Sequence, residues 1–276
     1  MIAAALALLM MQAGPNPADG AIQGLPDELR NRAPRAQPQT AAPARNSPLT
    51  DCLLLSRDDA DAALDRAQAW RESANSNLEL AQSAHCLGLA LVALERFGEA
   101  QQIFSLASEE APLEAPAYRA RLAAMAGNAA LAAGDADGAA GLFAGAVEHA
   151  KAADDSGLTA GLHIDRARAL VALDRLDEAA AALAQARASD PANAQAWLLS
   201  ATLSRRQERL GEAQQSIEYA ATLAPTNPAI GLEAGVIAAL AGREQDARRS
   251  FASVIDVAPD SDEARRAQVY LAQLQP

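Results

Sequence analysis

Apolar residues recur at helical spacing through most of the chain, in pairs of stretches separated by short polar turns. Between Leu87 and Pro112, two such stretches flank the turn Glu95-Arg96-Phe97-Gly98. Apolar positions three or four residues apart predict amphipathic helices, and a proline at the end of such a stretch stops the helix. This part of the sequence therefore predicts two helices joined by a tight turn.

The same pattern of small and large positions returns four more times. With Ala81 as position 1, position 8 is always small: Gly88, Gly127, Ala167, Ala201 and Gly235. Position 24 is always large and apolar: Phe104, Phe143, Leu183, Ile217 and Phe251. Packed helices tolerate no bulk where their backbones cross and need bulk beside the crossing. We therefore predict five helical hairpins, near residues 81–114, 120–153, 160–193, 194–227 and 228–261.

This register is similar to that of the tetratricopeptide repeat, whose period is 34 residues. The resemblance implies an all-α fold, a right-handed α-α superhelix of about five helix-turn-helix units. Helices over 56–73 and 262–274 are expected to cap the two ends of this solenoid, because terminal units need a polar outer face. The second unit is irregular, since Lys151 stands where the other four units have proline.

The N-terminal region has a different composition. Ile2 to Met11 are apolar and are followed by Gln12-Ala13-Gly14, which resembles a secretory signal peptide over residues 1–13, too short to span a bilayer. Residues 14–50 are rich in proline and alanine and predict a disordered linker before a solenoid over 51–276. We expect a periplasmic or secreted protein with no stable membrane insertion after cleavage.

Composition narrows the function. The formal net charge is −12, and only 3% of residues are aromatic. Nucleic-acid binding needs concentrated basic residues and often exposed rings, so we expect no nucleic-acid partner. The sequence has no GxSxG, Walker lysine loop, HExxH or CxxC motif. We therefore expect a protein that is not an enzyme and binds neither cofactor nor metal.

The resemblance also implies a binding site. In similar proteins the first helices of successive units line a concave groove that holds an extended peptide or a partner's helix. The corresponding residues here are His85, Arg121, Met125, Asn128, Arg168, Thr202, Arg205 and Arg206. Their arginines favour a ligand with carboxylates. The expected function is a protein- or peptide-binding scaffold in the cell envelope; the alternative is a structural subunit of an envelope complex that docks through its convex face or edges.

The chain has two cysteines, Cys52 and Cys86. Paired cysteines are common in exported proteins, so the sequence favours a disulfide between them. The alternative is that Cys86 is a small residue on a helix face and both thiols are free.

Overall fold

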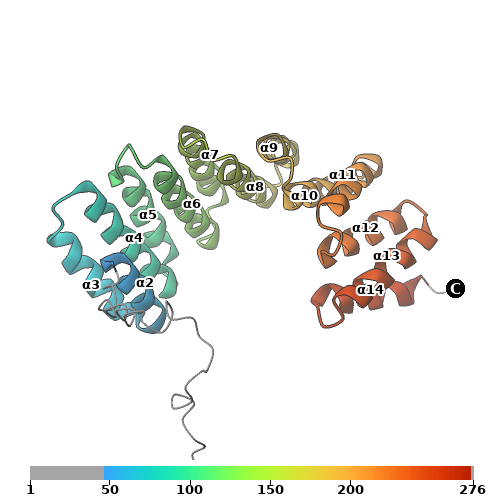
Figure 1. Cartoon of the computed structure of the whole chain (residues 1–276), viewed down its shortest axis with the longest axis horizontal. Helices are drawn as coiled ribbons and strands as arrows, with labels where there is room; N and C mark the ends of the chain where they lie inside the picture. The colour runs from blue at the N-terminus through green and yellow to red at the C-terminus, as the bar shows by residue number, and fades with distance from the viewer. Residues whose placement is uncertain (1–46, 275–276) are drawn as a thin grey trace, which may run out of the picture. The chain divides into compact units, whose positions relative to one another are not determined.

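The computed structural model describes residues 47–274, and this part of the chain forms 13 helices and no strand (Figure 1). The helices are α2 (Pro48–Asp58), α3 (Ala60–Glu72), α4 (Asn77–Ala93), α5 (Phe97–Glu110), α6 (Pro116–Ala132), α7 (Ala136–Ala152), α8 (Ser156–Ala172), α9 (Leu176–Ser189), α10 (Ala194–Arg206), α11 (Leu210–Leu223), α12 (Pro228–Leu240), α13 (Glu244–Val257) and α14 (Asp262–Gln273). Each helix packs on its neighbour in the chain. The all-α helical solenoid predicted from the repeats is confirmed.

The small and large positions of each hairpin pack against each other. A Cβ atom added to Gly88 would lie 2.5 Å from Cε1 of Phe104, and one added to Gly127 would lie 2.7 Å from Cε1 of Phe143. Both distances are far below an ordinary carbon–carbon contact of about 3.5–4.0 Å. Where position 8 is alanine, in the third and fourth units, position 24 is an aliphatic side chain instead of phenylalanine. The size of one residue is therefore matched to that of the other.

The turn inside each hairpin uses a residue with left-handed backbone conformation at position 15. These residues are Glu95, Gly134, Asp174, Glu208 and Gly242, with φ of 56°, 83°, 58°, 60° and 73°. Glycine adopts this conformation without cost, whereas other residues are disfavoured in it.

The second unit departs from the others at its exit. Its second helix, α7, has 17 residues, against 14 in α5, α9, α11 and α13. The turn that follows contains Asp154 with φ of 52°, so it resembles the turns inside the hairpins. Lys151 lies within α7, because without a proline at that position the helix continues. The irregular spacing of the second unit is thus an extended helix.

The N-terminal cap differs from the prediction. Instead of one helix over 56–73, the chain forms α2 and α3, and the break falls at Asp59. Ser56 lies inside α2, where its hydroxyl donates to the carbonyl of Leu53, whereas the carboxylate of Asp59 accepts from the amide of Ala62 and caps α3. Helix α2 begins at Pro48, two residues before the expected end of the linker. The predicted signal peptide and residues 14–46 of the linker lie outside the described residues.

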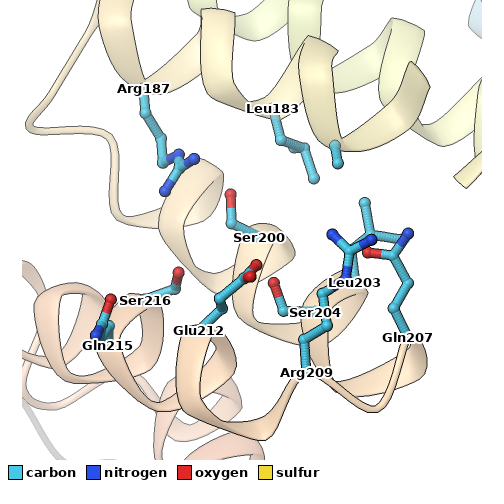
Figure 2. A pocket seen from close by; sticks show the side chains of 11 residues that line it. Leu183, Arg187, Ser200, Leu203, Ser204, Gln207, Arg209, Glu212, Gln215 and Ser216 are labelled. Atoms are coloured by element: carbon cyan, nitrogen blue, oxygen red, sulfur yellow. The ribbon is translucent and has the colours of Figure 1, made fainter. Parts of the chain in front are cut away.

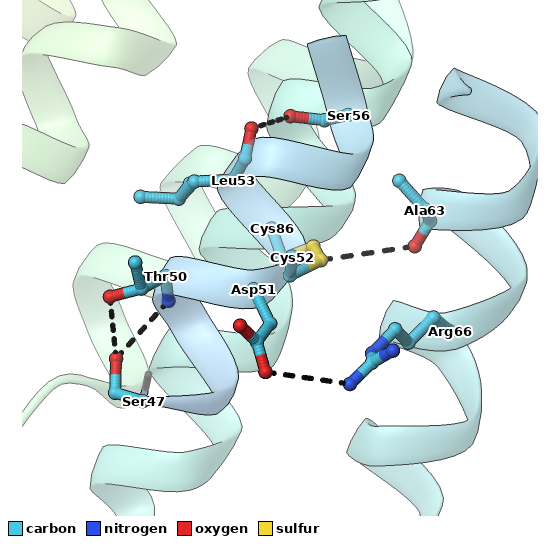
Figure 3. Close-up of a disulfide and its surroundings, with 9 residues drawn as sticks. All are labelled: Ser47, Thr50, Asp51, Cys52, Leu53, Ser56, Ala63, Arg66 and Cys86. Carbon is cyan, nitrogen blue, oxygen red and sulfur yellow. Dashed lines mark hydrogen bonds and ion pairs between the residues drawn. A yellow bond between two sulfur atoms is a disulfide. The ribbon is translucent and has the colours of Figure 1, made fainter. Parts of the chain in front are cut away.

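Cys52 and Cys86 join α2 to α4 through a disulfide, with Cα atoms 6.0 Å apart (Figure 3). Both side chains are buried, at 1% and 0% exposure. Sγ of Cys52 also lies 4.0 Å from the carbonyl oxygen of Ala63 in α3. A disulfide sulfur carries no hydrogen, so this is a packing contact. The bridge therefore sits at the meeting point of the first three described helices.

Within residues 47–274, no helix combines the length and the hydropathy that a membrane span needs.

Candidate functional site

A small pocket lies between α8, α9 and α10, with a cavity volume of about 100 Å³. Its lining includes three of the residues that the sequence assigned to the binding groove, Arg168, Thr202 and Arg206, together with the apolar side chains of Val171 and Leu199. These residues come from two successive units. The pocket thus combines an aliphatic wall with two guanidinium groups, a combination that suits an apolar side chain next to a carboxylate.

The two arginines of this pocket differ in their surroundings. Arg168 donates to the carboxylate of Asp165 at 2.6 Å, one turn earlier on α8. Burial raises the pKa of Asp165, and Arg168 opposes this effect. Arg206 is exposed and has no carboxylate within ion-pair distance among residues 47–274. Arg206 is therefore the cation of this pocket that is free to meet an anionic ligand.

Arg205, which the sequence also assigned to the groove, is held in an ion pair. Its Nε donates to Oε1 of Glu233 at 2.6 Å, which links α10 to α12. The side chains are 24% and 13% exposed, so the pair is largely shielded from water. Its guanidinium is already occupied by a carboxylate of the next unit and is not available to a ligand in this state.

Solved structures with the same arrangement of helices are known, although no family model and no curated protein matches the sequence. BtubC from P. vanneervenii has a TM-score of 0.58 at 13% identity, covering 84% of this chain and 95% of its own. PilF from Pseudomonas aeruginosa has a TM-score of 0.57 at 13% identity, with coverages of 81% and 96%. A double mutant of MamA has a TM-score of 0.53 at 17% identity, with coverages of 66% and 97%. PilF and MamA are tetratricopeptide-repeat (TPR) proteins.

The fold is a TPR solenoid. The pocket lies between the first helices of the third and fourth TPR units, α8 and α10, with Leu183 of the intervening α9 behind it. Identities of 13–17% show a shared fold alone, so the function of this chain has to be argued from its own residues.

The other predicted groove residues belong to the first two TPR units and do not line this pocket. Arg121 is exposed and lies 3.8 Å from the carboxylate of Asp155. Asn128 is exposed, and Met125 is half-buried against the core.

His85 lies inside the packing between α4 and α6 of the TPR stack. It is buried, and its Nδ1 is 3.2 Å from the hydroxyl of Tyr118. Its ring also meets that of Phe104 edge-on, with centroids 6.3 Å apart. Burial lowers the pKa of His85 and raises the pKa of Tyr118 to about 12. The pair fills the junction between the first and second units, so His85 is not open to a ligand in this state.

A second depression of about 170 Å³ lies beyond Leu183 and Leu203, which line both cavities. Figure 2 shows that its lining is polar, with Arg187, Ser200 and Glu212 directed toward it. The guanidinium of Arg187 lies 4.6 Å from the centroid of the Trp197 ring, a cation–π contact, and its Nε is buried with no hydrogen-bond partner in the described part of the chain. Sequence reasoning missed this depression because most of its residues come from the second helices α9 and α11 and from the turn between α10 and α11. The junction between the third and fourth TPR units is thus hollow on two sides.

Proposed function

We propose that this chain is a protein-binding scaffold that holds an extended segment of a partner in the pocket of Arg168, Val171, Leu199 and Arg206. The observation that carries the proposal is the convergence of groove residues from two TPR units on one cavity with an aliphatic wall and an unpaired guanidinium. The chain carries a net charge of −12, so an exposed cation beside an apolar cavity is unlike the average of its surface. A ligand with a carboxylate next to an aliphatic side chain complements both features.

The proposal can be tested with peptides selected on the full chain from a random display library. The measurements are the dissociation constants of the wild type and of Arg206→Glu, by fluorescence anisotropy. A charge-assisted hydrogen bond is worth about 1.5–3 kcal/mol, so reversal of this charge should weaken binding at least about tenfold. Added salt should also weaken the wild-type complex, because the contact is at the surface.

Arg249→Glu is the matched control. Arg249 lies on α13, is exposed, and is not among the residues of the pocket. The same charge reversal there should leave the dissociation constants unchanged. If the selected peptides bind Arg206→Glu as tightly as the wild type, the pocket is not the binding site. Docking through the convex face or the edges, as in a structural subunit, is then the better reading.

The proposed location of this scaffold is the cell envelope. It is supported by the apolar stretch Ile2–Met11, and by a buried disulfide of the kind that persists in oxidising compartments. N-terminal sequencing of the native protein should then begin near Gly14. Recovery of the protein with Met1 intact from the cytosol would contradict this part of the proposal.

A further inference from the structure

An apolar pocket lies at the C-terminal end of the described chain, between α12, α13 and α14. Its cavity volume is about 190 Å³, and Val236, Leu240, Phe251, Tyr270 and Leu274 are among its lining residues. Leu240 is 57% exposed although it is a large aliphatic residue. The ring of Tyr270 packs against that of Phe251, with centroids 5.5 Å apart, and forms a wall of the pocket. This pocket takes aliphatic or aromatic groups and has no charged residue in its lining.

The apolar pocket is the repeat counterpart of the pocket between α8 and α10. Two 34-residue periods separate the lining residues of one from those of the other. The counterparts of Arg168, Thr202 and Arg206 are Val236, Tyr270 and Leu274. The same site in the repeat is thus cationic in one place and apolar in the other.

The equivalent place one period along holds an ion pair. The counterparts of the aliphatic residues Val171 and Leu199 are Arg205 and Glu233, which form the ion pair between α10 and α12. An ion pair therefore fills the position that is an open aliphatic wall one unit earlier. Along the described chain, the order is therefore the pocket of Arg168 and Arg206 (the basic pocket), the ion pair of Arg205 and Glu233, and the apolar pocket.

From this order we infer that the apolar pocket is a second anchoring site for the same ligand, an extended partner segment with a carboxylate and, further along, a large apolar side chain. The inference rests on the proposed function of the basic pocket. Helices α10, α12 and α14 pack successively, and packed helices lie about 8–10 Å apart. Two such steps span roughly 16–20 Å, which an extended chain at about 3.3 Å per residue covers in about five or six residues.

The experiment uses the peptides selected on the full chain, after an alanine scan has identified their acidic and apolar anchors. Leu240→Asp should weaken binding about tenfold, because the aliphatic contact that the ligand would bury is lost. Leu113→Asp is the matched control, since Leu113 is 77% exposed in the connection between α5 and α6, far in sequence from both pockets. It should leave binding unchanged.

A gain of function separates binding from folding. Val236→Arg gives the apolar pocket the residue that its counterpart has at Arg168. A peptide whose distal apolar anchor is replaced by glutamate should then bind Val236→Arg at least tenfold more tightly than it binds the wild type. An unfolded variant cannot produce this reversal.

The outcomes distinguish the two proposals. If Arg206→Glu weakens binding but Leu240→Asp and Val236→Arg have no effect, the basic pocket stands and the second anchor is overturned. If Leu240→Asp weakens binding and Arg206→Glu does not, a ligand that spans both pockets is overturned together with the proposed function. The inference is supported when Arg206→Glu and Leu240→Asp both weaken binding of the same peptide, and the alanine scan places the two anchors of that peptide about five or six residues apart.

Discussion

Replacing Gly127 by alanine tests the size matching inside a TPR unit. The new Cβ would lie 2.7, 2.8 and 2.9 Å from Cε1, Cζ and Cδ1 of Phe143. An ordinary contact needs about 3.5 Å or more, so the ring or the helix has to move by roughly 0.8 Å. Phe143 is fully buried, so little free space is available for this movement. Overpacking of this kind costs about 1–3 kcal/mol.

Alanine also favours the helix by about 1 kcal/mol relative to glycine, and this opposes the steric cost. Gly141 supplies the control, because it lies in α7 of the same unit, is exposed, and has nothing within 4 Å of an added Cβ. Gly141→Ala should raise the free energy of unfolding by about 0.5–1 kcal/mol. The difference between the two variants isolates the steric term, and we expect it to be about 1–3 kcal/mol.

The assay is urea unfolding followed by circular dichroism, with amide hydrogen exchange in α6 and α7 as a local measure. The local measure is needed because repeat arrays can lose two-state cooperativity. Adding Phe143→Leu to Gly127→Ala reproduces the pair Ala167 and Leu183 of the next unit, and the double variant should recover part of the loss. The reasoning is refuted if Gly127→Ala stabilises as much as Gly141→Ala, or if the coupling to Phe143→Leu is below about 0.5 kcal/mol.

Three further predictions follow from the disulfide, the turns and the buried histidines. Thiol titration of the denatured, unreduced protein should find no free thiol, and reduction of Cys52–Cys86, which are 34 residues apart, should lower the free energy of unfolding by about 3–4 kcal/mol; two free thiols would contradict this. Glu208→Gly should raise the free energy of unfolding by about 1 kcal/mol, because the backbone φ of Glu208 is 60°. An unchanged free energy in urea unfolding would refute the strain argument. Burial lowers the pKa of His85 and His163 below the ordinary 6.5. Near and below pH 6.5 the unfolded chain therefore binds more protons than the folded chain. The free energy of unfolding should thus decrease as the pH falls below 6.5. Urea midpoints at about pH 7.5 and 5.5 test this, and glutamine variants at both positions should reduce the difference.

The repeat pattern predicted the fold well because each position was sampled five times. The pairing of position 8 with position 24 is visible in the sequence as glycine with phenylalanine and alanine with leucine or isoleucine, and the packing of Gly127 on Phe143 follows from it. The N-terminal cap occurs once and was predicted less well. Ser47 before Pro48 signals the start of α2. Ser56 and Asp59 are both residue types that cap the start of a helix, and only the packing decides that Asp59 caps α3.

The candidate site was predicted in part. Arg168, Thr202 and Arg206 converge on one pocket, as their repeat positions indicated. The pairing of Arg205 with Glu233 depends on which turn of α10 faces which turn of α12, and this requires the packing register between units. The opposite charges were visible in the sequence, but the contact was not.

The disulfide between α2 and α4 determines which end of the described chain unfolds first. The buried core of the described residues divides into four clusters along the chain, so each unit depends mainly on its neighbours. One end is fastened covalently, whereas α14 is held by packing on α12 and α13 and by the bond that Arg248 donates to the carbonyl of Leu274. Within the described chain, local unfolding should therefore begin at α14 and proceed toward α4, which the disulfide holds to α2. A ligand in the apolar pocket would hold α14 against α12 and α13, and this would oppose unfolding of the preceding units as well.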